Sequence, residues 1–378
     1  MIYLDNNATT KIDRRVYMKQ CELLNRHYGN PSSLHPMGVS VSNLLQQARK
    51  NVAHFIHADI QAGDRIIFTS CATESNNTVL HSFVNSHPEN KHVIVSAVEH
   101  PSILNTIAYY EHLGCQVTYV GVDKNGIIDE TELLEAIRDN TVLISIMLVN
   151  SETGVINDIS RLASIAKRRK PDVVFHTDAV QAAGKIPVDV SSLGVDLLTL
   201  SGHKFHAPKG VGVLFIKAGI EISPFLIGGH QEGDLRAGTE NTASIVAIGE
   251  AAMLANERLQ SGQIKQVELL RDEMEREMKS HFPDSVIFGE NALRVGNTTN
   301  IGFKNIDGVH LMLQLAKRNI CVSSGTACNS KSTSPSAVLS AMKAPEEYIK
   351  SIRISLSSEN TRDDIQELLK ALNDILNP

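Results

Sequence analysis

Between residues 65 and 217 the sequence alternates short apolar runs with helical patterns. The runs are rich in Val, Ile and Leu and occupy residues 65–70, 92–97, 116–122, 142–150, 173–178, 196–201 and 212–217. Most lack polar alternation, which indicates strands buried on both faces. Helical patterns at 74–84, 102–112, 131–138 and 159–167 lie between several of them and act as crossovers. The sequence therefore predicts an α/β fold with a large, mostly parallel seven-stranded sheet flanked by helices.

The pattern of predicted secondary structure changes after about Thr242. A long helical stretch covers 243–281, and shorter mixed elements follow, ending in an amphipathic helix at 362–376. With 378 residues and 42% hydrophobic content, the chain exceeds one ordinary domain of roughly 100–200 residues. We predict a large domain at 12–255 and a smaller α+β domain made of 1–11 and 256–378.

Charge and cysteine usage exclude several classes of function. The net charge of -6 comes from 36 basic and 42 acidic residues without a long single-sign run, so we expect no direct nucleic-acid contact. No apolar stretch approaches a membrane span of roughly 20 residues, and the first residues do not resemble a signal peptide. We expect a soluble, cytoplasmic protein that does not bind membranes. The five cysteines are scattered without a CxxC pair, which suggests neither disulfides nor a metal site.

Two of the apolar runs end on charged residues of opposite sign. One run ends at Asp178, and another is followed by Ser-Gly-His-Lys, which ends at Lys204. A lysine that forms a Schiff base and a carboxylate that pairs with a pyridinium nitrogen are the groups needed to hold pyridoxal 5'-phosphate. A structural salt bridge is the alternative for Asp178. The spacing of the two residues and the strand before Lys204 favour the cofactor.

Other polar residues follow the predicted strands. The segment TSCATESN at 69–76 passes from a strand into a helix, where hydroxyls and free N–H groups could bind a phosphate; an ordinary helix cap is the alternative. His100 also ends a strand, where its ring could stack on a cofactor and move protons. Arg353 alternates with apolar neighbours, which is consistent with either a substrate carboxylate clamp or a structural ion pair.

Taken together, these motifs resemble the cysteine desulfurases of the NifS/IscS type, fold type I enzymes in the class V aminotransferase group. The resemblance covers nearly the whole chain. It includes YLDNNATT at 3–10, GNPSS at 29–33, ATESNN at 72–77, EHP at 99–101, Asn150 with ETG at 152–154, SGHK at 201–204, Arg236 with Gly238-Thr239, and SSG at 323–325 with Ala327-Cys328.

The resemblance implies a role for each site residue. Lys204 would carry the cofactor, Asp178 would pair with the ring nitrogen, Gln181 would reach the ring hydroxyl, and His100 would stack on the ring. The remaining cofactor-binding residues would be Ala72, Thr73, Ser151, Ser201 and His203, with Thr73, Ser201 and His203 at the phosphate. Thr239 would reach the phosphate of a second subunit in a homodimer. Arg353 and Ser151 would hold the substrate.

Cys328 determines the reaction that the resemblance implies. It lies in a small, polar, glycine-containing run at 323–335, which predicts a loop. The expected activity is conversion of L-cysteine to L-alanine, with a persulfide formed on Cys328 and the sulfur passed to an acceptor protein. The alternatives are a selenocysteine lyase, another class V aminotransferase-like enzyme, or a sulfur-relay scaffold with impaired turnover.

The chain departs from the family at several positions. Cys71 replaces a usual Gly, Ser151 replaces the second Asn of Asn-Asn-Glu, and the segment at 228–237 differs at 230, 233 and 234. These departures suggest a specialised sulfur pathway, such as nucleic-acid sulfur modification, rather than general iron-sulfur assembly.

Overall fold

The computed structural model describes residues 1–324 and 336–377, and all seven predicted strands form one sheet. They are β2 (Arg65–Thr69), β3 (His92–Ser96), β4 (Gln116–Val120), β5 (Thr141–Ser145), β6 (Val174–Asp178), β7 (Leu197–Ser201) and β8 (Gly212–Ile216), in the spatial order β2-β8-β7-β6-β5-β3-β4. β8 runs antiparallel to its neighbours β2 and β7, and the other pairs are parallel. The prediction of a mostly parallel sheet is confirmed.

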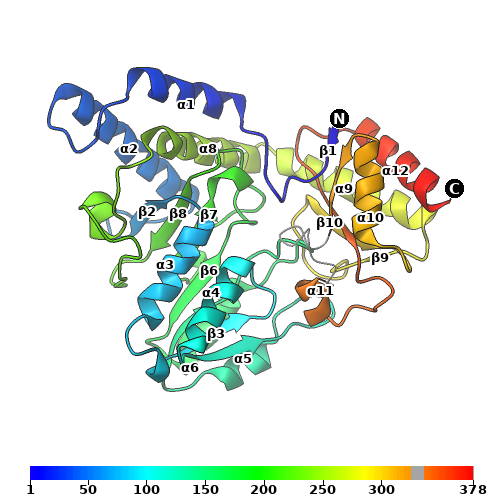
Figure 1. The fold of residues 1–378 in the computed structure, drawn as a ribbon, viewed down its shortest axis with the longest axis horizontal. Coiled ribbons are helices and arrows are strands. Elements are labelled where there is room, and N and C mark those ends of the chain that lie inside the picture. Colours follow the sequence, from blue (N-terminus) through cyan, green and yellow to red (C-terminus); the bar gives the residue numbers. More distant parts are fainter. Residues whose placement is uncertain (325–335, 378) are drawn as a thin grey trace.

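Successive side chains of each strand pack on opposite faces of this sheet, as its geometry requires. Val93 packs with one set of helices, and Ile94 packs with the other. The first set is α3 (Ala72–Val84) and α4 (Pro101–His112). The second includes α1 (Arg14–Arg26), α2 (Pro36–Phe55), α5 (Glu130–Ala136), α6 (Ile159–Arg169), α7 (Val190–Leu193) and α8 (Thr242–Gln260). Helices on both faces explain why the strands are apolar throughout (Figure 1).

A smaller part with its own core lies beside the large sheet, and both chain termini belong to it (Figure 1). Its strands are β1 (Ile2–Tyr3), β9 (Val286–Ile287), β10 (Thr298–Gly302), β11 (Ile320–Cys321), β12 (Ser323–Ser324) and β13 (Ile352–Ser355). Its helices are α9 (Gln263–His281), α10 (Gly308–Lys317), α11 (Ala337–Ala341) and α12 (Arg362–Leu376). Short 3-10 turns occur at η1 (Pro88–Asn90), η2 (Gly202–Lys204) and η3 (Gln231–Asp234). This part has its own core, while the division into a large domain at 12–255 and a smaller domain at 1–11 and 256–378 stays a prediction.

The long helical stretch expected at 243–281 is two helices, so that expectation needs a correction. α8 ends at Gln260 and α9 begins at Gln263. Between them, Gly262 adopts a φ of 77°, a left-handed conformation that a helix interior does not contain. The break lets α8 pack against the large sheet while α9 packs in the smaller core.

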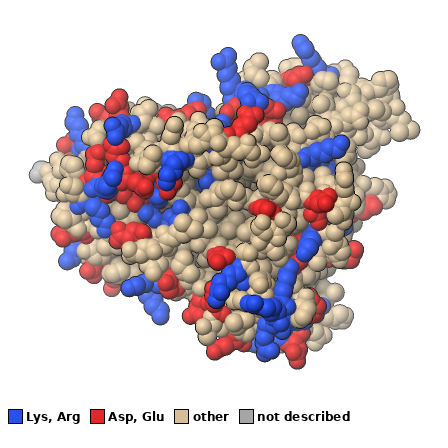
Figure 2. Space-filling model, turned by 180° about the vertical axis from the view of Figure 1, so that it is seen from behind, with Lys and Arg blue, Asp and Glu red and all other residues tan. Residues whose placement is uncertain are grey.

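The charged residues of the face in Figure 2 are of mixed sign, with blue and red interspersed over most of it. This distribution agrees with the absence of long single-sign runs in the sequence. Within residues 1–324 and 336–377, no helix combines the length and apolar character needed to span a bilayer.

His176, at the centre of the sheet, makes stability depend on pH. Its ring lies 2.8 Å from Ser145 Oγ and 3.0 Å from Thr199 Oγ1, and burial lowers its pKa to about 3. The unfolded chain takes up a proton near pH 6.5 while the folded chain stays neutral, so stability falls as pH falls below 6.5. The His176→Gln variant should lose this contribution, about 1.4 kcal/mol per pH unit. Urea unfolding of both proteins at about pH 7 and pH 5 measures it; equal pH slopes would contradict the assignment.

Candidate active site

A cavity of about 330 Å³ lies where the polar ends of the sheet strands meet the N-terminal segment and β13. Ten of the residues predicted for the site line it: Ala72, Thr73, His100, Ser151, Asp178, Gln181, Ser201, His203, Lys204 and Arg353. Thr239 does not line this cavity and is exposed. Cys328 lies outside the described residues. The sheet therefore brings together side chains that are far apart in the sequence.

Asp178 closes β6 as a buried carboxylate, only 5% exposed. One oxygen accepts a hydrogen bond from Asn76 Nδ2 at 2.9 Å, and the other accepts from the Val180 backbone N–H at 3.0 Å. In the described part of the chain no cation forms an ion pair with it. A buried carboxylate is costly without a cationic partner, so the structural salt bridge considered as an alternative is not observed. The site is suited to a cationic ligand.

Lys204 follows β7 in the turn η2, and the N-terminal segment holds its amine. Lys204 Nζ donates to Asn7 O at 2.7 Å and to Ala8 O at 2.9 Å. The turn is fixed from the same segment, because Thr10 N and Thr10 Oγ1 both donate to His203 O. Residues near the start of the chain thus position the lysine over the cavity.

The first turn of α3 faces the same cavity, because Ala72 and Thr73 line it. Its N-cap is Cys71, in an extended conformation, and among the described residues no side chain caps the helix. The N-terminus of a helix carries free N–H groups and a partial positive charge, which favour an anion. Thr73 is exposed in this first turn. Residues 1–324 and 336–377 therefore supply no ordinary side-chain cap here, and the geometry is suited to a phosphate.

Two histidines at the cavity are kept neutral near pH 7. Burial, assisted by the charges of Lys204 and Lys209, lowers the pKa of His203 to about 4. Burial also lowers the pKa of His100, and its Nδ1 accepts a hydrogen bond from the Ser102 N–H at 3.1 Å. A neutral imidazole whose Nδ1 is an acceptor carries its proton on Nε2. His100 can therefore donate a hydrogen bond from Nε2.

Arg353 is an ion-pair partner and a cavity residue at once. It is 3% exposed; one guanidinium nitrogen lies 2.8 Å from Asp5 Oδ1 and the other donates to Ser151 O at 3.1 Å. Its third nitrogen, Nε, is buried and has no hydrogen-bond partner in the described structure. The structural ion pair is present, and the guanidinium also remains able to meet a carboxylate.

The altered segment at 228–237 is anchored through Glu232. This residue has a φ of 48°, accepts two hydrogen bonds from the Arg49 guanidinium and a third from Phe68 N in β2. Arg236 pairs with Glu74 in the first turn of α3 at 2.9 Å. The unusual His230 and Asp234 are exposed and contact each other. The departures from the family pattern therefore lie outside the buried anchors of this segment.

Three residues contact Lys204 or Asp178 but were not among the predicted site residues. They are Asn7, Ala8 and Asn76, which lie within the motifs of the family resemblance and had no role assigned to them. The carbonyl oxygens of Asn7 and Ala8 could not be identified because backbone acceptors leave no residue-type signal. Asn76 could have been predicted, because it lies in the second turn of the helix that follows the predicted phosphate-binding segment. A buried amide at that position requires a polar partner.

Comparison with known proteins agrees with this geometry. Residues 2–368 match the family model described as Aminotransferase class-V, so the fold and the cavity define a class V aminotransferase. A protein named Cysteine desulfurase 2 from Trichormus variabilis is 44% identical and aligns with 98% of this chain and 92% of its own. Cysteine desulfurase NifS of Azotobacter vinelandii is 40% identical, with 98% and 91% covered. Within that class, the chain belongs to the cysteine desulfurase family.

Solved structures give the same fold. A NifS-like protein superimposes with a TM-score of 0.92 at 35% identity and covers 99% of both chains. A structure described as SspA in complex with cysteine superimposes with a TM-score of 0.82 at 32% identity, covering 96% of this chain and 100% of its own. The predicted fold type I architecture is thereby confirmed.

Proposed function

We propose that the protein converts L-cysteine to L-alanine with pyridoxal 5'-phosphate and collects the sulfur as a persulfide on Cys328. The observation that carries the proposal is the buried Asp178 carboxylate, which lacks a cation among the described residues and shares a cavity with Lys204. A pyridinium nitrogen supplies the missing positive charge, and the lysine supplies the amine for a Schiff base.

The described residues fit this cofactor. The uncapped start of α3 at Ala72 and Thr73, together with Ser201 and His203, would bind the phosphate. Asp178 would pair with the ring nitrogen, Gln181 would donate to the ring oxygen, and the half-buried His100 would stack on the ring. When bound, the cofactor provides an electron sink for the substrate carbon.

Arg353 and Ser151 are proposed to hold the substrate. The buried Nε of Arg353 has no protein partner in the described structure, and a carboxylate would satisfy it. Ser151 lines the cavity, and its carbonyl oxygen already accepts from the same guanidinium. The planar Arg353 guanidinium would hold the substrate by its carboxylate, so that the substrate sulfur points away from Arg353.

The reaction also requires a group that takes up a proton from the substrate and returns it. Lys204 would take the proton from the substrate α carbon, since its amine lies at the cavity. The Cys328 thiolate would attack the substrate sulfur; the sulfur–sulfur bond forms, the carbon–sulfur bond breaks, and its electron pair goes to the substrate. Lys204 would return its proton to the carbon side to complete alanine, and the neutral His100 ring would donate a hydrogen bond from Nε2.

Residues that flank the Cys328 segment support this assignment. On one side, Ser323 pairs with Arg353 across β12 and β13. On the other, Ser336 Oγ donates to Glu152, the residue after Ser151. Both described ends of the segment are thus beside the cavity.

We further propose a cytoplasmic homodimer that passes its sulfur to an acceptor protein. Tyr28 and Leu34, between α1 and α2, are 75% and 96% exposed, and the projecting end of these helices carries few charges (Figure 2). Exposed large apolar side chains such as these favour a second subunit, and the exposed Thr239 would then reach that subunit's phosphate. The four described cysteines are free, which is consistent with a reducing compartment.

Substrate comparison tests the proposed activity. Purified protein with bound cofactor is incubated with cysteine, with selenocysteine, or with alanine and a keto acid. With a thiol reductant present to release sulfide from the persulfide, we expect alanine and sulfide from cysteine at more than one equivalent per protein. Selenocysteine as the only substrate would indicate a lyase, transamination would indicate a plain aminotransferase, and a single equivalent would indicate a relay scaffold.

A further inference from the structure

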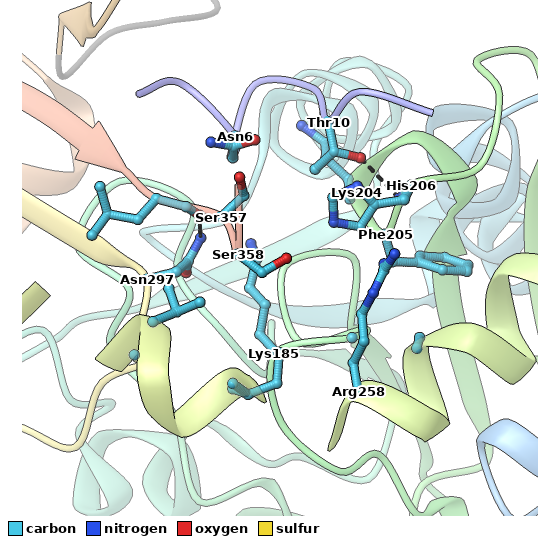
Figure 3. A pocket seen from close by; sticks show the side chains of 16 residues that line it. Asn6, Thr10, Lys185, Lys204, Phe205, His206, Arg258, Asn297, Ser357 and Ser358 are labelled. Carbon is cyan, nitrogen blue, oxygen red and sulfur yellow. Dashed lines mark hydrogen bonds between the residues drawn. The ribbon is translucent and has the colours of Figure 1, made fainter. Parts of the chain in front are cut away.

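Lys185 carries a buried amine that lies behind Lys204, and burial, assisted by the charges of Lys204 and Arg353, holds the pKa of this amine well below its usual value. It is 9% exposed, and within residues 1–324 and 336–377 no carboxylate forms an ion pair with it. It lines a second, small cavity of about 50 Å³, together with Lys204, Asn297 and Ser358 (Figure 3). In Figure 3 the amine of Lys185 points toward the strands and turns above it rather than to the surface. Burial of an amine is costly unless hydrogen bonds compensate for the lost water.

The Lys185 amine binds two side-chain amides at once. Lys185 Nζ donates to Asn7 Oδ1 at 2.9 Å and to Gln181 Oε1 at 2.5 Å. On its other side, Gln181 Nε2 donates to Asn7 O at 3.0 Å. The Gln181 amide thus lies between a group with N–H donors and a carbonyl that can only accept. One orientation satisfies both neighbours, and it directs an N–H group, not an oxygen, along the cavity wall.

We propose that Lys185 is a positioning residue that holds the Gln181 amide with its N–H group toward the ring oxygen of the cofactor. The inference rests on the proposed cofactor, and it concerns a residue that does not line the substrate cavity. The amide NH₂ has two hydrogens; Asn7 O takes one, and the second is directed to the ring oxygen. The N–H donor on Oε1 also polarises the amide and strengthens that second hydrogen bond.

The predicted consequence is visible in the absorbance of the bound cofactor. A donor to the ring oxygen stabilises negative charge there, and so favours the deprotonated form of the linkage between Lys204 and the cofactor. When the Gln181 amide is not held, the pH midpoint of this absorbance change should rise. The other titratable or charged groups around the cavity, namely Asp178, His100, His203, Lys204 and Arg353, are the same in every variant below.

The test is a pH titration of absorbance without substrate. Lys185→Met, which removes the donor, should raise the midpoint by about one pH unit. Lys185→Arg keeps the N–H donors and has the small cavity for its extra volume, so its midpoint should not rise above that of the parent protein. Lys185→Gln keeps an amide donor without charge and should shift less than half as far. In a Gln181→Leu background, Lys185→Met should add no further shift.

Three results would overturn the proposal: an unchanged midpoint in Lys185→Met, a shift in Lys185→Gln as large as in Lys185→Met, or full additivity with Gln181→Leu. The last two would mean that Lys185 acts on the cofactor independently of the Gln181 amide. If Lys185→Met does not fold, a Lys185→Gln shift as large as that of Gln181→Leu would overturn the proposal in its place. A parent protein without any cofactor band would contradict the proposed function instead, which separates the two failures.

Discussion

Replacement of Lys204 by alanine should lower turnover of cysteine by about 10³-fold or more and remove the visible absorbance of the linked cofactor. The amine is expected both to attach the cofactor and to take the α proton, and a positioned general base alone contributes typically 10²–10⁴-fold. The fold should tolerate the change, because the hydrogen bonds lost from Lys204 Nζ end on the Asn7 and Ala8 carbonyls, which border a polar cavity.

Lys217→Ala is the matched control for this variant. Lys217 follows β8, is exposed, and does not line the cavity, so both absorbance and turnover should stay unchanged. Absorbance and initial rates are measured on the same preparations. A Lys204→Ala protein that keeps the linked cofactor band, with turnover within about tenfold of the parent, would contradict the assignment of the lysine.

Replacement of Cys328 by serine should abolish sulfide and alanine formation while the cofactor absorbance stays. A hydroxyl has a similar shape, but it is a far weaker nucleophile toward sulfur than a thiolate. Loss of turnover with an intact cofactor band would separate the sulfur-accepting step from cofactor binding. Sulfide release and alanine are the two products to quantify.

Cys321→Ser is the control for the second variant. Cys321 pairs with Tyr3 between β11 and β1 and does not line the cavity, so its replacement should leave turnover in place. Unchanged turnover in Cys328→Ser would reject Cys328 as the nucleophile. Cys71, whose thiol lines the cavity, would then be the next candidate for the nucleophile.

The large sheet could be predicted from the sequence because its strands are buried on both faces. Continuous apolar runs such as those that became β6 and β7 have few other stable environments. The same rule placed Asp178 and Lys204 near each other, since the carboxyl ends of neighbouring parallel strands meet at one edge. Local sequence therefore determined most of the fold and the chemical centre of the site.

The contacts that complete the site depend on long-range packing and could not be predicted. The pairing of Arg353 with Asp5 joins residues at opposite ends of the chain, and neither has a local pattern that names the other. The hold of the N-terminal segment on Lys204 uses backbone oxygens. The break between α8 and α9 depends on one glycine that either helix could have contained.

Mass spectrometry of the protein after addition of L-cysteine tests the central claim most directly. The cofactor-loaded protein is mixed with cysteine in the absence of reductant and acceptor, and its peptides are then identified without reducing them. The account predicts the mass of one added sulfur atom on the peptide that contains Cys328, with an equivalent of alanine in solution. Alanine formed without added sulfur on Cys328, or added sulfur on Cys71 instead, would contradict it.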